Sequence, residues 1–266
     1  MDILTIIGYL GGILIGVSLG LIGGGGSILT VPILVYLMGT SPVVATAYSL
    51  FIVGFSSLVG SISYIKKNRV SIKTAAIFGL PSIFAIYSTR KYLVPSIPHT
   101  ILAIGDFTLT KDHAVMILFA LLMIAASYNM IKKNKNDIEV ESAPQKFNYP
   151  AILLEGIVVG TLTGLVGAGG GFLIIPALVI LSKLPMKMAV GTSLIIIATN
   201  SLIGFLGDLS NYEIDWSILG IFSTMAVGGI FIGSWLSNFI SGKKLKPAFG
   251  VFVLVMGVSI ILKEIL

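Results

Sequence analysis

Two glycine-rich runs are the part of this sequence best suited to bind a small ligand. They read Gly-Gly-Gly-Gly-Ser at 23–27 and Gly-Ala-Gly-Gly-Gly at 167–171. Because glycine costs about 1 kcal/mol against alanine inside a helix, each run predicts a helix break. A helix that restarts there directs its free N–H groups and positive dipole end back at the break, which favours an anion. The alternative interpretation is a packing hinge that binds nothing.

The sequence lacks the residues that a nucleotide site, a metal site or a catalytic site would need. The first run has no Gly-Lys-Ser/Thr ending and follows an apolar helix instead of a strand, which argues against a nucleotide site. The chain has no cysteine and two histidines, His99 and His113. A metal cluster, a His-Glu-x-x-His protease and a Ser–His pair are therefore not expected. We expect no cofactor, no metal and no enzymatic activity.

Hydroxyl and amide side chains follow each glycine run. Such groups donate hydrogen bonds without a permanent charge, so they could hold an anion and still release it. The alternative is hydrogen bonding between helices, as is common in membranes. Together with the glycines, the candidate substrate-binding residues are Gly24, Gly25, Gly26, Ser27, Ser49 and Ser57 in the first half, and Gly169, Gly170, Gly171, Thr192, Ser193 and Asn200 in the second.

Glu155 is the clearest carboxylate inside an apolar segment. Ionisable residues there are costly and often functional, so a role in proton coupling is one interpretation. The other is that Glu155 reaches water, since it lies about one turn from the polar stretch 132–148.

The residues around the glycine runs are duplicated. Gly16 aligns with Gly160, a shift of 144 residues, and the match continues through the glycine runs to Pro32 and Pro176. Gly16 and Gly160 also belong to rows of small residues at four-residue spacing, which predict close helix packing. We predict a first repeat at 1–131, a cytoplasmic linker at 132–148 and a second repeat at 149–266.

The elements that position these residues are predicted to be membrane helices. The chain is 56% hydrophobic and 11% charged, against about 25% charged in soluble domains. We expect an all-α integral membrane protein with eight to ten transmembrane helices. The apolar segments are 3–22, 26–39, 42–65, 72–93, 113–131, 149–167, 170–183, 187–207, 215–240 and 247–264. Two of them, 26–39 and 170–183, are too short to cross comfortably and follow the glycine runs.

Five segments in each repeat imply that the second repeat inserts inverted relative to the first, with a substrate site near the midplane. Basic residues gather at 66–73, 132–146 and 243–246, whereas 208–215 is acidic. The positive-inside rule then places the basic loops in the cytoplasm and both termini outside a cell membrane. The first repeat has extra residues around 94–112, which we predict to be an outer loop.

The duplicated pattern Gly-x-x-x-Gly-x-x-Gly-x-Gly-Gly, followed six residues later by proline, resembles the sulfite exporter family TauE/SafE. It runs from Gly16 to Pro32 and from Gly160 to Pro176, and Ala-Val-Gly-Thr-Ser at 189–193 is also like that family. The resemblance implies a permease that exports sulfite or organosulfonates such as sulfoacetate. The first copy departs from the pattern, because Tyr48 stands where the second copy has Thr192.

The leading hypothesis is a secondary transporter that exports a small anion by alternating access around the two glycine breaks. The alternatives are a passive anion channel and a transporter of another small organic anion. The expected partners are the anion and the lipid bilayer. We expect no binding to nucleic acid. A coupling ion, H+ or Na+, and a homo-oligomer are left open.

Overall fold

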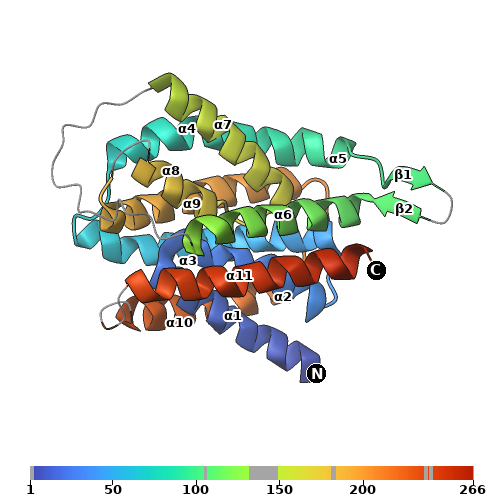
Figure 1. Ribbon diagram of the computed structural model, residues 1–266, viewed down its shortest axis with the longest axis horizontal. Helices are drawn as coiled ribbons and strands as arrows, with labels where there is room; N and C mark the ends of the chain where they lie inside the picture. The colour runs from blue at the N-terminus through green and yellow to red at the C-terminus, as the bar shows by residue number, and fades with distance from the viewer. Residues whose placement is uncertain are drawn as a thin grey trace.

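The computed structural model describes residues 3–104, 107–131, 149–180, 184–236, 239 and 242–265, and it is a helical bundle (Figure 1). The first repeat contains α1 (Ile3–Ile22), the 3-10 helix η1 (Gly23–Leu29), α2 (Thr30–Tyr36), α3 (Pro42–Lys66), α4 (Ile72–Ser88), the π-helix η2 (Thr89–Leu93), α5 (Val94–Ser96), β1 (Thr100–Ile104), β2 (Phe107–Thr110) and α6 (Lys111–Ile131). The second contains α7 (Tyr149–Val166), α8 (Gly171–Ile180), α9 (Met186–Asp208), α10 (Trp216–Leu236) and α11 (Gly242–Ile265).

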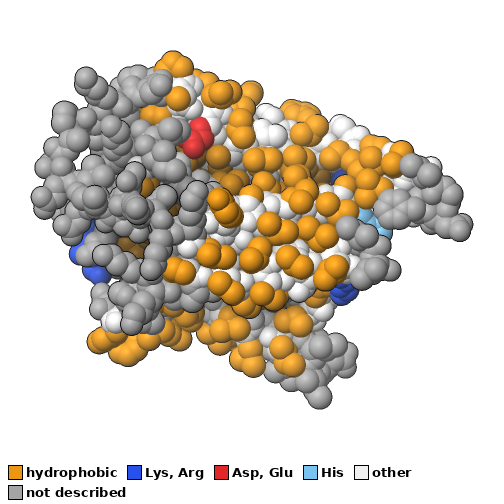
Figure 2. Space-filling model, viewed as in Figure 1, with side chains coloured by type: hydrophobic (Ala, Val, Ile, Leu, Met, Phe, Trp, Pro, Cys, Tyr) orange, Lys and Arg blue, Asp and Glu red, His pale blue; other side chains and the backbone are white. Residues whose placement is uncertain are grey.

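Each predicted apolar segment corresponds to helix in the described residues, and the all-α class is confirmed. Five helices are long and apolar enough to span a bilayer, and three shorter apolar helices accompany them within the described ranges. Large side chains such as Phe84 and Leu154 are 75% and 63% exposed on the outer surface. Figure 2 shows hydrophobic side chains across the middle of the visible face, as lipid contact requires.

Two segments differ from the predictions. The expected outer loop at 94–112 contains a β-hairpin, in which Ile104 pairs with Phe107, and its side of the membrane stays a prediction. The third basic group, Lys243 to Lys246, was expected in a loop but lies at the start of α11. Lysine is a good helix former, so the helix can begin before the apolar segment does.

Helices related by the shift of 144 residues make corresponding contacts. α1 packs on α10, and its equivalent α7 packs on α4. The central helices α3 and α9 pack together between these pairs, and α6 packs along α11. The start of α1 and the end of α11 lie toward the end of the bundle that carries the hairpin (Figure 1). The inverted orientation of the two repeats in a membrane stays a prediction.

The predicted rows of small residues lie where α1 packs on α10 and where α7 packs on α4. A Cβ atom on Gly16 would collide with the Ala226 carbonyl oxygen of α10. A Cβ atom on the equivalent Gly160 would lie 2.5 Å from the Ser82 carbonyl oxygen of α4. Both rows therefore let two helix backbones approach closely, as the spacing predicted.

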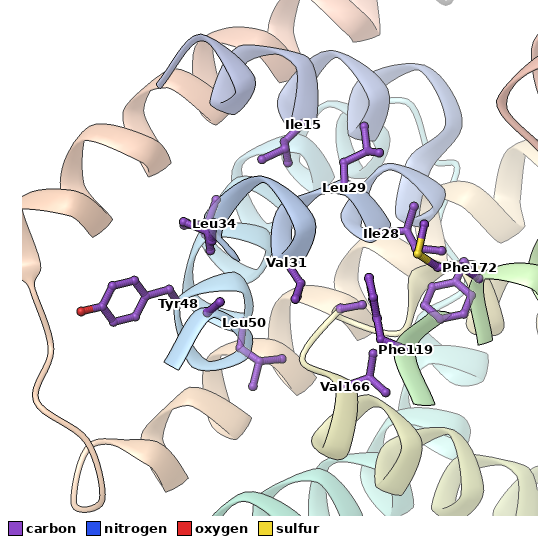
Figure 3. Packing of buried hydrophobic residues seen from close by; sticks show 14 of the residues in the cluster. Ile15, Ile28, Leu29, Val31, Leu34, Tyr48, Leu50, Phe119, Val166 and Phe172 are labelled. Carbon is purple, nitrogen blue, oxygen red and sulfur yellow. The ribbon is translucent and has the colours of Figure 1, made fainter. Parts of the chain in front are cut away.

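The core gathers around the first glycine break. Figure 3 shows buried side chains converging from both repeats, including Ile15 of α1, Leu34 of α2, Phe119 of α6 and Phe172 of α8. Ile15, Leu34 and Phe119 are fully buried, and Phe172 is 7% exposed. The short segment from η1 to α2 is thus surrounded by protein, which is where a broken helix is tolerated in a membrane.

Candidate functional site: the crossing of two glycine breaks

The two glycine runs break their helices by different means. After α1 ends at Ile22, the first run continues as the 3-10 helix η1, in which Gly23 has a positive φ. After α7 ends at Val166, the second run turns through Gly169 and Gly170, both at φ +68°, before α8 begins. The predicted breaks are confirmed, and the first run continues in helical form as a 3-10 helix. Its glycines are accommodated in tightened helical turns, where the Ser27 hydroxyl donates to the Gly24 carbonyl at 2.8 Å.

The two breaks touch at their backbones. A Cβ atom on Gly24 would collide with the Gly171 Cα, and one on Gly171 would collide with the Gly24 Cα. Gly26 lies equally close to Ser18 and to the Leu19 backbone of α1, and Gly25 lies in η1. We call the contact between Gly24 and Gly171 the glycine crossing. It joins the first repeat to the second, and a substrate site between the repeats stays a prediction.

Unpartnered hydroxyls lie beside the second break. Gly170 faces the Thr163 hydroxyl, and a Cβ atom on Gly169 would lie 3.2 Å from the Ser201 Oγ. The Thr163 and Ser201 hydroxyls are buried and have no hydrogen-bond partner among the described residues. Thr163 was not predicted, because a threonine inside an apolar helix gives no signal until the fold brings Gly170 against it.

The predicted serines of α3 are also buried. Ser49 and Ser57 are fully inaccessible, and neither hydroxyl has a partner within the described ranges. Ser57 corresponds to Ser201 under the shift of 144 residues, and α3 packs along α9. Ser193, the equivalent of Ser49, instead donates to the Val190 carbonyl at 2.8 Å. Serines at Ser57 and Ser201 thus supply both central helices with donors not used in the fold.

Thr192 has a structural hydrogen bond. Its hydroxyl accepts from the backbone N–H of Ser71 at 3.0 Å, just before α4. Tyr48 occupies the equivalent position, and its hydroxyl accepts from the backbone N–H of Asp215 at 2.8 Å, just before α10. Figure 3 shows the Tyr48 ring pointing away from α3. Tyr48 and Thr192 differ in side chain, but each hydroxyl accepts a hydrogen bond from a backbone N–H of the other repeat.

Asn200 connects two helices of different repeats. Its Nδ2 donates to the Ser82 Oγ of α4 at 2.6 Å, whereas its Oδ1 has no partner among the described residues. Glu155 lies far from the crossing, because it precedes the end of α7 at Val166 by about 16 Å of helix. The structure does not bring this carboxylate together with the other predicted site residues.

Three buried charged residues, Arg90, Lys111 and Asp208, were missed. Asp208 was assigned to an outer loop and Arg90 was not singled out, but both are fully inaccessible, and Arg90 Nη1 lies 3.4 Å from Asp208 Oδ2. Burial raises the pKa of the nearby Tyr212 hydroxyl, and the Asp208 carboxylate raises it further, so Tyr212 stays neutral. The available signal was Arg90 itself, an ionisable residue inside the apolar segment 72–93.

Comparison with known proteins assigns the fold to a family. A family model described as "Sulfite exporter TauE/SafE" matches residues 8–260. A "Probable membrane transporter protein" of Xylella fastidiosa (strain 9a5c) is 30% identical over 258 residues, which cover 93% of this chain and 91% of that protein. The "Probable membrane transporter protein YunE" of Bacillus subtilis is 29% identical over 268 residues, 94% of this chain and 92% of the relative. No solved structure matches significantly. The chain therefore belongs to the TauE/SafE family of membrane transporters.

Proposed function

We propose that this protein is a secondary transporter that exports a small anion of the sulfite or organosulfonate class by alternating access at the glycine crossing. The repeats at 1–131 and 149–266, joined by the linker 132–148, move relative to one another. The basic loops face the cytoplasm, both termini lie outside the cell membrane, and H+ or Na+ drives the transport. The observation that carries the proposal is the backbone contact of Gly24 with Gly171 beside buried, unpartnered hydroxyls.

The hydroxyls are suited to a substrate that must be released. A buried hydroxyl without a partner costs about 1–3 kcal/mol, so its presence in both central helices calls for a compensating role. Ser57 and Ser201 could each donate one hydrogen bond to an oxyanion, and the N-terminus of the ten-residue helix α8 adds its dipole. Each of these groups is neutral, so its hydrogen bond to the anion is weaker than one from a charged side chain.

The exchanged packing provides surfaces that can move. α1 is held by α10 of the other repeat and α7 by α4, while α3 and α9 meet at the centre. Small residues line the outer contacts, where smooth backbone surfaces can slide. Opening the glycine crossing toward one side of the membrane at a time would give alternating access.

The first test is an anion screen on purified protein in detergent, with unfolding temperature as the readout. Sulfite, sulfoacetate, taurine, sulfate, lactate and chloride are each added. An anion at a hundredfold excess over its Kd stabilises the folded protein by about 2.7 kcal/mol. We expect a selective rise with sulfite or sulfonates. A cooperative transition that none of the anions moves would contradict the proposal.

Counterflow in proteoliposomes then separates a carrier from a channel. Vesicles loaded with unlabelled anion are diluted into a trace of labelled anion. A carrier accumulates the label transiently, because each inward step is coupled to an outward step, whereas a channel only equilibrates it. Label uptake without an overshoot, at rates that do not saturate, would favour a passive channel.

A further inference from the structure

The guanidinium of Arg90 has donors that the described structure leaves unused. Nη1 donates to the Thr46 Oγ1 at 3.0 Å, and the Thr46 hydroxyl donates in turn to the Val43 carbonyl at 2.6 Å. Nε and Nη2, which carry three of the five guanidinium N–H groups, have no partner among the described residues. The whole side chain is inaccessible. Arg90 is therefore fixed along one edge and unsatisfied along the other.

The unsatisfied edge lies against the second glycine break. A Cβ atom on Gly167, the first residue of that break, would lie 2.6 Å from Arg90 Nη2. Gly167 is also pressed against Thr46, the residue that holds Nη1. The break continues from here to Gly171 at the glycine crossing. The free donors of Arg90 thus lie against Gly167, at the start of the break that leads to the glycine crossing.

Asp208 only partly satisfies Arg90. Its Oδ2 lies 3.4 Å from Nη1, and neither carboxylate oxygen has a hydrogen-bond partner within the described ranges. A buried ion pair compensates the loss of hydration only when its remaining hydrogen bonds are also made. In this pair, those hydrogen bonds are unmade on both Arg90 and Asp208 among the described residues. Buried polar groups of this kind are rare and call for a specific explanation.

At the two equivalent positions, the other half of the molecule has a serine and a tyrosine in place of the ion pair. Under the shift of 144 residues, Arg90 corresponds to Ser234 and Asp208 to Tyr64. A Cβ atom on Gly23, the equivalent of Gly167, would lie 2.8 Å from the apolar Val190 Cγ1, whereas one on Gly167 would meet Thr46 and Arg90. The repeated architecture therefore does not need an ion pair at this place, so the pair serves a purpose beyond packing.

We propose that Arg90 is an anion-binding residue of the transporter. Its Nε and Nη2 receive two oxygens of an oxyanion that enters the second glycine break, and Asp208 balances the guanidinium when no anion is bound. A planar fork of this kind matches sulfite, sulfonate and carboxylate groups, all of which present two oxygens side by side. The inference rests on the proposed function and names the group that recognises its substrate.

The test compares anion binding to three variants by isothermal titration with sulfite and methanesulfonate. Arg90→Lys keeps the charge but loses the fork, and we expect affinity to fall about tenfold or more. Asp208→Asn keeps the shape but removes the competing charge, and we expect affinity to rise about tenfold. Lys91→Gln removes a neighbouring exposed cation and should leave affinity unchanged. Each protein is first shown to be monodisperse by size exclusion.

The outcomes separate this inference from the proposed function. Wild-type protein that binds none of the anions would overturn the proposed function, and the role of Arg90 with it. Wild-type binding that Arg90→Lys leaves intact would overturn the role of Arg90 alone. If Arg90→Lys does not fold, Asp208→Asn decides: unchanged or weaker affinity of the folded protein would show that the pair is structural.

Discussion

The two glycine breaks occupy equivalent places but have different conformations and surroundings. The first is a 3-10 helix that continues directly into α2, and its leading Gly23 faces an apolar side chain. The second turns through Gly169 and Gly170 at positive φ, and its leading Gly167 faces Arg90. A duplicated sequence has therefore produced a site with one apolar and one cationic approach. The surroundings of the two breaks therefore differ in charge although their sequences are repeated.

The largest effect is expected where the two breaks touch. In Gly171→Ala the new methyl group would collide with the Gly24 Cα, and neither backbone can move aside without displacing its repeat. We expect transport to be lost and the free energy of unfolding to fall by about 1–3 kcal/mol. Anion uptake into proteoliposomes and the unfolding temperature measure the two effects.

The matched control is Gly228→Ala in α10, since a Cβ atom there meets nothing within 4 Å. Alanine is the better helix former by about 1 kcal/mol, so this variant should keep transport and full stability. If Gly171→Ala transports like Gly228→Ala, the crossing does not hold the repeats together and the comparison of the breaks loses its basis.

A smaller effect is expected from the equivalent serine hydroxyls of the two central helices, Ser57 on α3 and Ser201 on α9. The double variant Ser57→Ala, Ser201→Ala removes two buried hydroxyls that have no partner in the described residues. Without anion, we expect the unfolding temperature to rise, because an unsatisfied buried hydroxyl costs about 1–3 kcal/mol. With anion, we expect affinity to fall about tenfold, since two neutral hydrogen bonds contribute roughly 1 kcal/mol each at most.

The control for these serines is Ser61→Ala on α3, whose hydroxyl donates to the Leu58 carbonyl at 2.7 Å and has no serine equivalent in the second repeat. Its anion affinity should equal that of wild type. A double variant that is more stable yet binds anions normally would show that Ser57 and Ser201 are outside the site.

The helices and their breaks could be predicted because they depend on local sequence. α1 was predicted at 3–22, as observed, since an uninterrupted apolar segment meets a run of glycines that weakens any helix. The close packing of Gly16 and Gly160 was equally predictable from their spacing. The conformation of each break was not, because glycine adopts positive and negative φ at similar cost and the surroundings choose between them.

The ion pair and the hairpin depend on contacts that local sequence does not contain. Arg90 and Asp208 are 118 residues apart (208 − 90), and only the packing of η2 near the end of α9 brings them together. Asp208 looked like part of an acidic loop because Glu213 and Asp215 follow it closely. Strands β1 and β2 are short and lie beside helices, so their alternation gave too weak a pattern.

The smallest effect is expected at Tyr48 and its equivalent Thr192, where the two repeats differ in sequence but agree in structure. Tyr48→Phe and Thr192→Val each leave one backbone N–H, of Asp215 or of Ser71, without its hydroxyl acceptor. Hydrogen bonds in membrane proteins contribute about 0.6 kcal/mol on average, so both variants should lower the unfolding temperature slightly and by similar amounts. If the two hydroxyls serve only to fix the starts of α10 and α4, neither variant changes anion affinity. Weaker anion binding in Thr192→Val alone would show that Thr192 also contacts the substrate, and that the repeats have diverged in function at this position as well as at Arg90.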